Sequence, residues 1–252
     1  VPTMGALHDG HLSLLQKSLE ENDLTVMSIF VNPTQFNNAD DLKKYPRTLE
    51  ADVQKVHNLN PNIVVFAPSV EDIYEGNTVS EPFSFDGLEF QMEGKHRQGN
   101  FDGVGTIVKK LFEIVLPTRD YFGEKDFQQL QIIKKMVQKE QMTVEVIGRP
   151  IFREKSGLAM SSRNARLSES EKQEATKIYK TLLQAKELFK NNDIQFVEQW
   201  VEAQFQDDQH MSVEYFEIAD EETLEKATTK IEGKIFRAFI VVYVNDVRLI
   251  DT

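Results

Sequence analysis

Two histidines lie three residues apart in a glycine-containing turn near the start of the chain. His8 and His11 flank Asp9 and Gly10 in the run Met4-Gly5-Ala6-Leu7-His8-Asp9-Gly10-His11, where a short apolar segment passes into a stretch with helical spacing. The amino terminus of a helix offers unpaired N–H groups and a partial positive charge, and imidazoles can donate hydrogen bonds to phosphate oxygens. The turn therefore predicts a phosphate site at which negative charge develops.

The same two histidines allow two simpler interpretations. One of them can merely cap the helix that follows. A His-x-x-His pair can also belong to a zinc site, but the chain has no cysteine and its only other imidazoles are His57, His96 and His210. The spacing therefore favours phosphate over zinc.

A second polar group lies near the middle of the chain, in a loop that contains Ser156 and Gly157. It reads Met160-Ser161-Ser162-Arg163-Asn164. The planar guanidinium of Arg163 can grip phosphate oxygens, and the hydroxyls of Ser161 and Ser162 can add hydrogen bonds. The alternative is an ordinary turn followed by the start of a helix.

Two further groups follow expected strands. In Gly123-Glu124-Lys125-Asp126, Lys125 can meet a phosphate, and Gln129 comes shortly afterwards on a helix. Gln35 follows another strand, in Asn32-Pro33-Thr34-Gln35-Phe36. Two neutral amides can recognise hydroxyls and a carboxylate oxygen without forming an ion pair that weakens the nucleophile. A surface role is the alternative for each amide.

The elements that carry these residues alternate between strand and helix over residues 1–150. Strands are expected at residues 24–31, 62–67, 121–122 and 143–147, and helices at 11–21, 49–59, 104–115 and 127–137. This order predicts an α/β domain, a parallel sheet with helices on both faces, whose ligands bind at the carboxyl ends of the strands. Residues 151–252 predict a smaller α+β domain, with helices at 168–190 and 193–205 and strands at 211–218, 235–244 and 247–250.

Charge narrows the class of ligand. The 252 residues carry a net charge of −12, which argues against a nucleic-acid partner. Residues 95–166 nevertheless hold 14 basic and 8 acidic side chains, whereas residues 167–234 hold 8 and 16. A local basic segment suits a small polyanion such as a nucleotide triphosphate. No apolar run is long enough to span a bilayer, and the lack of cysteine agrees with the cytoplasm, where we expect the protein.

Together these motifs resemble the pantothenate synthetases, the pantoate–β-alanine ligases, over nearly the whole chain, including Tyr45-Pro46-Arg47-Thr48 and Phe127-Gln128-Gln129-Leu130. The resemblance implies two steps: pantoate and Mg-ATP give pantoyl adenylate and pyrophosphate, and β-alanine then gives pantothenate and AMP. It implies that His8, His11, Lys125 and Arg163 act in catalysis, with His11 as proton donor, and that Gln35 and Gln129 bind pantoate and Gln35 also β-alanine. It assigns to ATP the residues Met4, Gly5, Ala6, Leu7, His8, Asp9, Gly10, His11, Gly123, Glu124, Lys125, Asp126, Phe152, Met160, Ser161, Ser162 and Arg163.

The resemblance also implies a Rossmann-like domain over residues 1–150, a C-terminal lid over residues 151–252, a homodimer, and a further strand before Val1. The magnesium ligands are not evident, and Asp52 is either a candidate or a solvated helix residue. Three other functions share the first motif. A nucleotidyltransferase acting on a phosphate is disfavoured by the glutamine pair, and an aminoacyl-tRNA synthetase by the acidic second domain. A regulatory nucleotide-binding module has little use for the phosphate loops.

Overall fold

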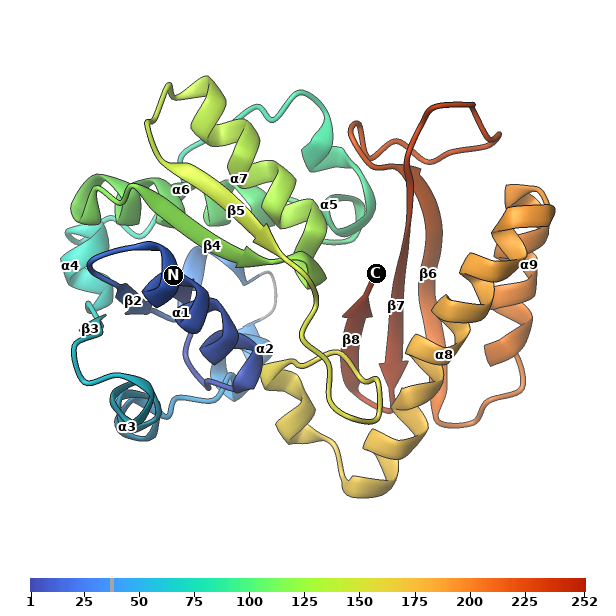
Figure 1. The fold of residues 1–252 in the computed structure, drawn as a ribbon, viewed down its shortest axis with the longest axis horizontal. Coiled ribbons are helices and arrows are strands. Elements are labelled where there is room, and N and C mark those ends of the chain that lie inside the picture. The colour runs from blue at the N-terminus through green and yellow to red at the C-terminus, as the bar shows by residue number, and fades with distance from the viewer. Residues whose placement is uncertain (37–38) are drawn as a thin grey trace. The chain divides into compact units, whose positions relative to one another are not determined.

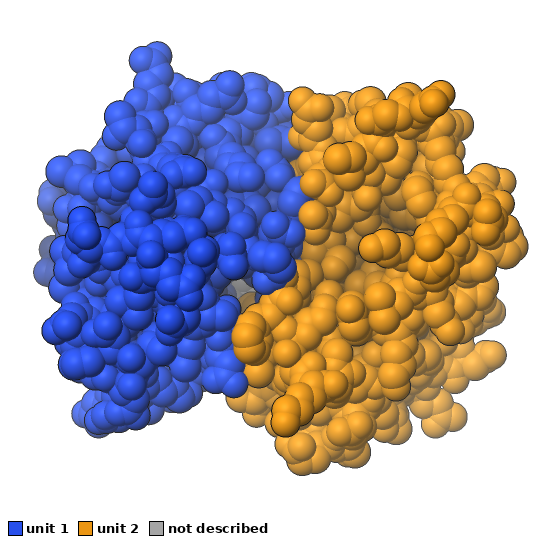
Figure 2. All heavy atoms as spheres, in the orientation of Figure 1, with its two compact units in different colours: residues 1–150 blue, residues 151–252 orange. Residues whose placement is uncertain are grey.

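The computed structural model describes residues 1–36 and 39–252, which form two compact units (Figures 1 and 2). Unit 1 is Val1–Pro150 and unit 2 is Ile151–Thr252. Each unit has its own strands and its own buried apolar cluster. The functional groups are therefore described within the unit that carries them.

Unit 1 is built on parallel strands that alternate with helices. β2 pairs in parallel with β1 and β3, and β4 pairs in parallel with β5. Most of β2 is buried, as its mainly apolar and β-branched composition predicts for a strand covered on both faces. The strands are β1 (Pro2–Thr3), β2 (Val26–Ile29), β3 (Val64–Phe66), β4 (Arg119–Gly123) and β5 (Glu145–Arg149).

β1 also lies beside β4 and joins the two sets of strands. At one end, the nitrogen of Val1 is 3.2 Å from Oδ1 of Asp120 in β4. At the other end, Lys125 follows β4 and acts electrostatically on His8, which follows β1. The two strands therefore run in the same direction. The contact between β1 and β4 places the ladder β3-β2-β1 beside the ladder β4-β5, which gives the spatial order β3-β2-β1-β4-β5. The chain winds outward in opposite directions from β1 and from β4, so the switch point of the sheet lies between these two strands.

Helices cover both faces of this sheet (Figure 1). Right-handed crossovers that leave the switch point in opposite directions place α1 and α7 on opposite faces. α1 packs against α3, and α6 packs against α7. The helices are α1 (Asp9–Glu21), α2 (Ala39–Lys44), α3 (Leu49–Leu59), α4 (Val70–Tyr74), α5 (Met92–His96), α6 (Asn100–Val115) and α7 (Phe127–Lys139). The expected α/β class is confirmed.

Unit 2 combines two helices with an antiparallel sheet in the order β6-β7-β8. Its elements are α8 (Glu169–Asn191), α9 (Ile194–Phe205), β6 (Met211–Asp220), β7 (Phe236–Val244) and β8 (Val247–Asp251). Apolar residues from both helices and all three strands form its core. This agrees with the expected α+β composition.

The sequence did not predict the short helices. α2, α4 and α5 have five or six residues each, too few to show a helical period. Short 3₁₀ turns, η1 (Pro33–Gln35), η3 (Glu124–Asp126) and η4 (Ser162–Arg166), carry several of the polar groups. No helix within the described residues is both long enough and apolar enough to cross a membrane.

Candidate active site

The turn that follows β1 has an unusual backbone. Gly5 and Ala6 both have positive φ, at 82° and 51°, a region that alanine rarely adopts. Asp52 on α3 accepts hydrogen bonds from the N–H groups of Ala6 (2.9 Å) and Leu7 (2.8 Å). A Cβ on Gly5 would lie 3.1 Å from the same carboxylate. The glycine therefore leaves room for Asp52.

His8 and His11 stack at the start of α1. Their ring centroids are 4.0 Å apart, and the backbone N–H of His8 donates to Nδ1 of His11 at 3.3 Å. A ring nitrogen that accepts a hydrogen bond carries no proton, so neutral His11 holds its proton on Nε2. Nδ1 of His8 is buried and has no hydrogen-bond partner among the described residues. His8 is also the N-cap residue of α1.

Both imidazoles are neutral at physiological pH. Burial, and then the charge of Lys125, lowers the pKa of His8 to about 4. Burial, and then His8 and Lys125, lowers the pKa of His11 to about 3. Neutral rings act as hydrogen-bond donors and acceptors, so His11 offers a neutral Nε2–H group.

These lowered pKa values predict a pH dependence of stability. The unfolded chain binds protons below about pH 6.5, whereas the folded chain resists them until about pH 4, so the free energy of unfolding falls as the pH drops through this window. In the His11→Gln variant, the free energy of unfolding should fall less steeply with pH than in the wild type. The difference in slope should reach up to roughly 1.4 kcal/mol per pH unit. Urea unfolding at pH 7, 6 and 5 measures this slope. The control is His57→Gln, which replaces an exposed histidine of α3 and should show the wild-type slope. An equal slope in all three proteins would contradict the burial of His8 and His11.

Lys125 is the cation of this group. It lies in η3, directly after β4, and its ammonium is 3.0 Å from the carboxylate of Asp126. Its charge lowers the pKa of both His8 and His11, which places it close to the imidazole pair. The adjacency of β1 and β4 thus brings Lys125 close to His8 and His11, which lie more than a hundred positions earlier in the sequence.

Gln35, in η1, is held by a buried amide that the sequence did not single out. Asn32 donates to Oε1 of Gln35 (3.1 Å) and to the carbonyl of Gly103 (3.0 Å), while its own oxygen accepts from the hydroxyl of Tyr74 (2.6 Å). The amide nitrogen of Gln35 lies 3.1 Å from the sulfur of Met4. Gln35 therefore presents N–H donors beside the turn after β1. The position of Asn32 at a strand end before proline was the available signal.

Helix α6 comes unusually close to η1 at Gly103. A Cβ there would lie 2.5 Å from the carbonyl oxygen of Thr34 and 2.9 Å from the nitrogen of Gln35. Because backbone cannot yield as a side chain does, Gly103→Ala should displace Gln35. We expect the KM for the carboxylic-acid substrate to rise on the order of tenfold.

The control for this substitution is Gly105→Ala in the same helix. Its Cβ would meet only the rings of Phe83 and Phe85, at 3.0 to 3.2 Å. Steady-state kinetics on the two purified proteins makes the comparison. A normal KM in Gly103→Ala, or an equal rise in both variants, would contradict the positioning of Gln35.

The glutamines of α7 have different environments. Gln128 is buried; it accepts from the N–H of Glu93 (3.0 Å) and donates to the carbonyls of Leu88 and Gln91 (2.8 Å each). It therefore anchors the segment before α6. Gln129 is only half-buried, one residue further along the first turn of α7.

The predicted residues Phe152 and Met160 to Arg163 belong to unit 2. Met160 donates its N–H to the carbonyl of Phe152 at 3.0 Å, so these two residues face each other across a hairpin. Arg153, beside Phe152, holds Asp251 with two hydrogen bonds of 2.6 and 2.8 Å. η4 begins at Ser162, and the hydroxyl of Ser161 accepts from the N–H of Arg163 at 3.3 Å. Phe152 therefore lies next to the predicted group Met160 to Arg163 within unit 2.

Asp52 does not fit the role of a magnesium ligand. It is fully buried; Oδ1 accepts from Leu7, and Oδ2 accepts from Ala6 and from the hydroxyl of Thr48 (3.1 Å). Nor is it a solvated helix residue, the other alternative. Across the described parts of the chain, no group of three or more histidines and carboxylates is arranged to hold a metal ion.

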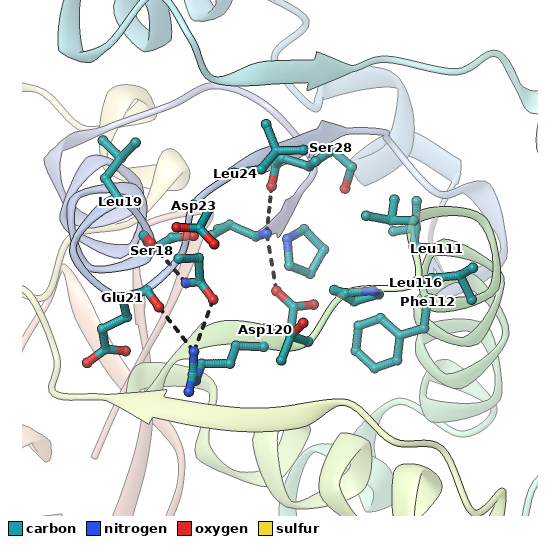
Figure 3. A pocket seen from close by; sticks show the side chains of 18 of the residues that line it. Ser18, Leu19, Glu21, Asp23, Leu24, Ser28, Leu111, Phe112, Leu116 and Asp120 are labelled. Carbon is teal, nitrogen blue, oxygen red and sulfur yellow. Dashed lines mark hydrogen bonds and ion pairs between the residues drawn. The ribbon is translucent and has the colours of Figure 1, made fainter.

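A large cavity lies in unit 1 at the amino ends of the strands, opposite the end that carries the histidine pair (Figure 3). Its volume is about 790 Å³, and it is lined by the end of α1, the starts of β1, β2 and β4, and the end of α6. Arg119 borders it and donates to the carbonyl of Glu21 (3.1 Å) and to Asn22 (3.3 Å). Because ligands of such sheets bind at the carboxyl ends of the strands, the histidine pair marks the candidate site in preference to this cavity.

Comparison with known proteins identifies the family of this chain. A family model described as pantoate-beta-alanine ligase matches residues 1–252. The pantothenate synthetase of Flavobacterium psychrophilum is 60% identical over 251 residues, which cover 100% of this chain and 89% of that protein. The pantothenate synthetase of Fervidobacterium nodosum is 49% identical, with the same two coverages.

Two solved structures share the fold. The pantothenate synthetase of Thermus thermophilus superposes with a TM-score of 0.92 at 37% identity, covering 99% of this chain and 90% of that one. The ligase of Francisella tularensis, complexed with beta-gamma ATP and beta-alanine, gives 0.78 at 36% identity, covering 99% and 86%. Since the match extends over the whole chain in both sequence and fold, this chain belongs to the pantoate–β-alanine ligase family.

Proposed function

We propose that this chain condenses pantoate with β-alanine at the expense of ATP, by way of a pantoyl adenylate, and releases pyrophosphate and AMP. The observation that carries the proposal is the grouping of His8, His11 and Lys125 at the switch point of the sheet. Neutral donors and one cation suit a place where phosphate oxygens gain charge. The relative that was solved with ATP and β-alanine supports the choice of substrates.

In the first step, a carboxylate oxygen of pantoate attacks the α-phosphorus of ATP. The bond to the bridging oxygen breaks, and pyrophosphate leaves with the electron pair. Nε2–H of His11, the imidazole of His8 and the ammonium of Lys125 stabilise the charge that develops on the leaving group. His11 acts here by hydrogen bonding, because its ring is neutral before ATP binds.

In the second step, the unprotonated amine of β-alanine attacks the acyl carbon of the adenylate. The bond between that carbon and the phosphate oxygen breaks, AMP leaves with the electron pair, and the new amide nitrogen loses one proton to solvent. The reaction needs no covalent link to the protein. It requires that water be kept from the adenylate until the amine arrives.

Each substrate would be bound by a different group of residues. Gln35 and Gln129 would bind pantoate through neutral amides, with Gln35 also close to β-alanine. The ATP contacts would come from Met4 to His11, from Gly123 to Asp126, and from Phe152 and Met160 to Arg163, with Arg163 on the phosphates. Magnesium would enter with ATP, bound mainly by phosphate oxygens and water, as this ion prefers.

We further propose that unit 2 acts as a lid and that the protein works as a homodimer in the cytoplasm. Light scattering of the purified protein would measure its mass in solution. A monomer that retains full activity would contradict the dimer without affecting the proposed reaction.

Pyrophosphate release tests the proposed function. With ATP and pantoate but no β-alanine, the enzyme should release about one equivalent of pyrophosphate and stop, because the adenylate stays bound. Addition of β-alanine should then release AMP and restart turnover. Pyrophosphate release without pantoate, or a requirement for a phosphorylated alcohol, would indicate a nucleotidyltransferase instead.

A further inference from the structure

The turn after β1 holds an anion with its backbone, and that anion is a carboxylate of the chain itself. Two successive residues, Gly5 and Ala6, have positive φ, and the N–H groups of Ala6 and Leu7 converge on one carboxylate. Successive N–H groups arranged in this way bind phosphate in other proteins. Here the anion is Asp52, which accepts from both of these N–H groups.

Helix α3 holds the turn by its carbonyl as well. Lys55 lies one turn after Asp52, and its ammonium donates to the carbonyl oxygen of Leu7 at 2.7 Å. Thr48, the residue before the helix, donates its hydroxyl to Oδ2 of Asp52 at 3.1 Å. Val56, on the same face as Asp52, is fully buried in the apolar core of unit 1. The peptide groups on both sides of Leu7 are thus tied to a helix that is itself fixed in the core.

The tie reaches the histidine pair through one residue. Leu7 precedes His8, and the backbone N–H of His8 is the group that donates to Nδ1 of His11. That hydrogen bond selects the form of His11 with its proton on Nε2. A shift of the Leu7 peptide would therefore move the N–H of His8 away from Nδ1 of His11. The His11 ring could then carry its proton on either nitrogen.

We propose that Asp52, assisted by Lys55, is a positioning residue that sets His8 and His11 for the reaction. In this role its carboxylate accepts hydrogen bonds from the backbone of the turn and does not contact metal or nucleotide. The effect on the imidazoles is a property of the ligand-free protein. The effect on rate rests on the proposed function.

The first measurement needs no substrate. In Asp52→Asn, the side chain keeps one acceptor and turns a donor toward the backbone N–H groups. Imidazole ¹⁵N spectra of the wild type should show His11 as a fixed Nε2–H tautomer, and the chain has only five histidines to assign. In Asp52→Asn the two nitrogen shifts of His11 should move toward an average. Glu50→Gln removes an exposed carboxylate from the same helix and should leave the spectrum unchanged.

The second measurement is the rate of adenylate formation in a single turnover. It should fall on the order of 10- to 100-fold in Asp52→Asn, as displaced catalytic groups do. Thr48→Val, which removes only the hydroxyl, should show a smaller change in the same direction. The magnesium concentration for half-maximal rate should be the same in all variants.

These results separate the positioning role from other roles. A folded Asp52→Asn protein with wild-type imidazole signals would overturn the proposal, and so would recovery of its rate by excess magnesium, which would mark a metal ligand. If Asp52→Asn does not fold, Lys55→Met gives a second test, because it removes the donor to the carbonyl of Leu7. Since the charge of Lys55 also lowers the pKa of both histidines, the readout in this variant is the tautomer of His11 at a pH where the ring is neutral. A further outcome is a wild type that itself forms no adenylate while Asp52→Asn still alters the His11 signals. That pair of results would uphold the positioning role and reject the proposed function.

Discussion

Replacement of His11 by alanine is expected to lower the rate of adenylate formation on the order of a hundredfold or more, as loss of a preorganised donor to a developing charge does. The reason is geometric: Nδ1 of His11 is occupied by the N–H of His8, so the proton on Nε2 has a fixed direction. The measurement is a single turnover with excess enzyme, ATP and pantoate, followed by quantification of pyrophosphate.

The matched control for His11→Ala is His57→Ala. His57 is an exposed histidine near the end of α3, and its loss removes an imidazole without touching the site. We expect its rate to equal that of the wild type. A near-normal single-turnover rate in His11→Ala would remove this residue from the mechanism.

The second large effect is expected for Lys125→Ala, again on the order of a hundredfold or more in adenylate formation. After burial, the charge of Lys125 lowers the pKa of both His8 and His11, and it does so more than the charge of Lys55. Its removal should therefore also raise both pKa values, which NMR titration of the imidazoles would detect. This second readout distinguishes loss of the cation from general damage.

Lys134→Ala is the control for Lys125→Ala. Lys134 is exposed on α7, the helix that begins directly after the η3 turn that carries Lys125. The variant makes the same change of charge away from the histidine pair. Unchanged imidazole pKa values in Lys125→Ala, or an equal loss of rate in Lys134→Ala, would contradict the role of Lys125.

The strands and long helices of unit 1 were predictable because their patterns are local. The helix expected at residues 49–59 matches α3, and the run at 24–31 contains β2, which is covered on both faces and needs no alternation. The first helix starts earlier than expected, at Asp9, because His8 occupies the capping position. Ends of elements depend on such single contacts, which a periodic pattern does not contain.

The turn after β1 shows what the sequence could not supply. Composition and spacing pointed to phosphate at His8 and His11, but they gave no reason for Asp52 beyond a candidate metal ligand. Its partners Ala6 and Leu7 are 46 and 45 positions away, and the contact exists only because α3 packs beside α1. The strained turn, the carboxylate and the fixed tautomer are thus consequences of tertiary packing.

Asn32 was overlooked for a related reason. An asparagine before proline is common at the end of a strand, and nothing local connects it with Tyr74 or Gly103. In the fold its amide is fully engaged, and it fixes which end of Gln35 faces outward. The proposed recognition of a carboxylic acid by Gln35 therefore depends on a buried neighbour.

The most direct test of the account is the fate of oxygen from the carboxylate of pantoate. If the carboxylate attacks the α-phosphorus, pantoate labelled with ¹⁸O in its carboxyl group should transfer one labelled oxygen to AMP and keep the other in the new amide. Mass spectrometry of the two products reads the label. Unlabelled AMP, or label in inorganic phosphate with release of ADP, would show that no pantoyl adenylate forms and would contradict the proposed reaction.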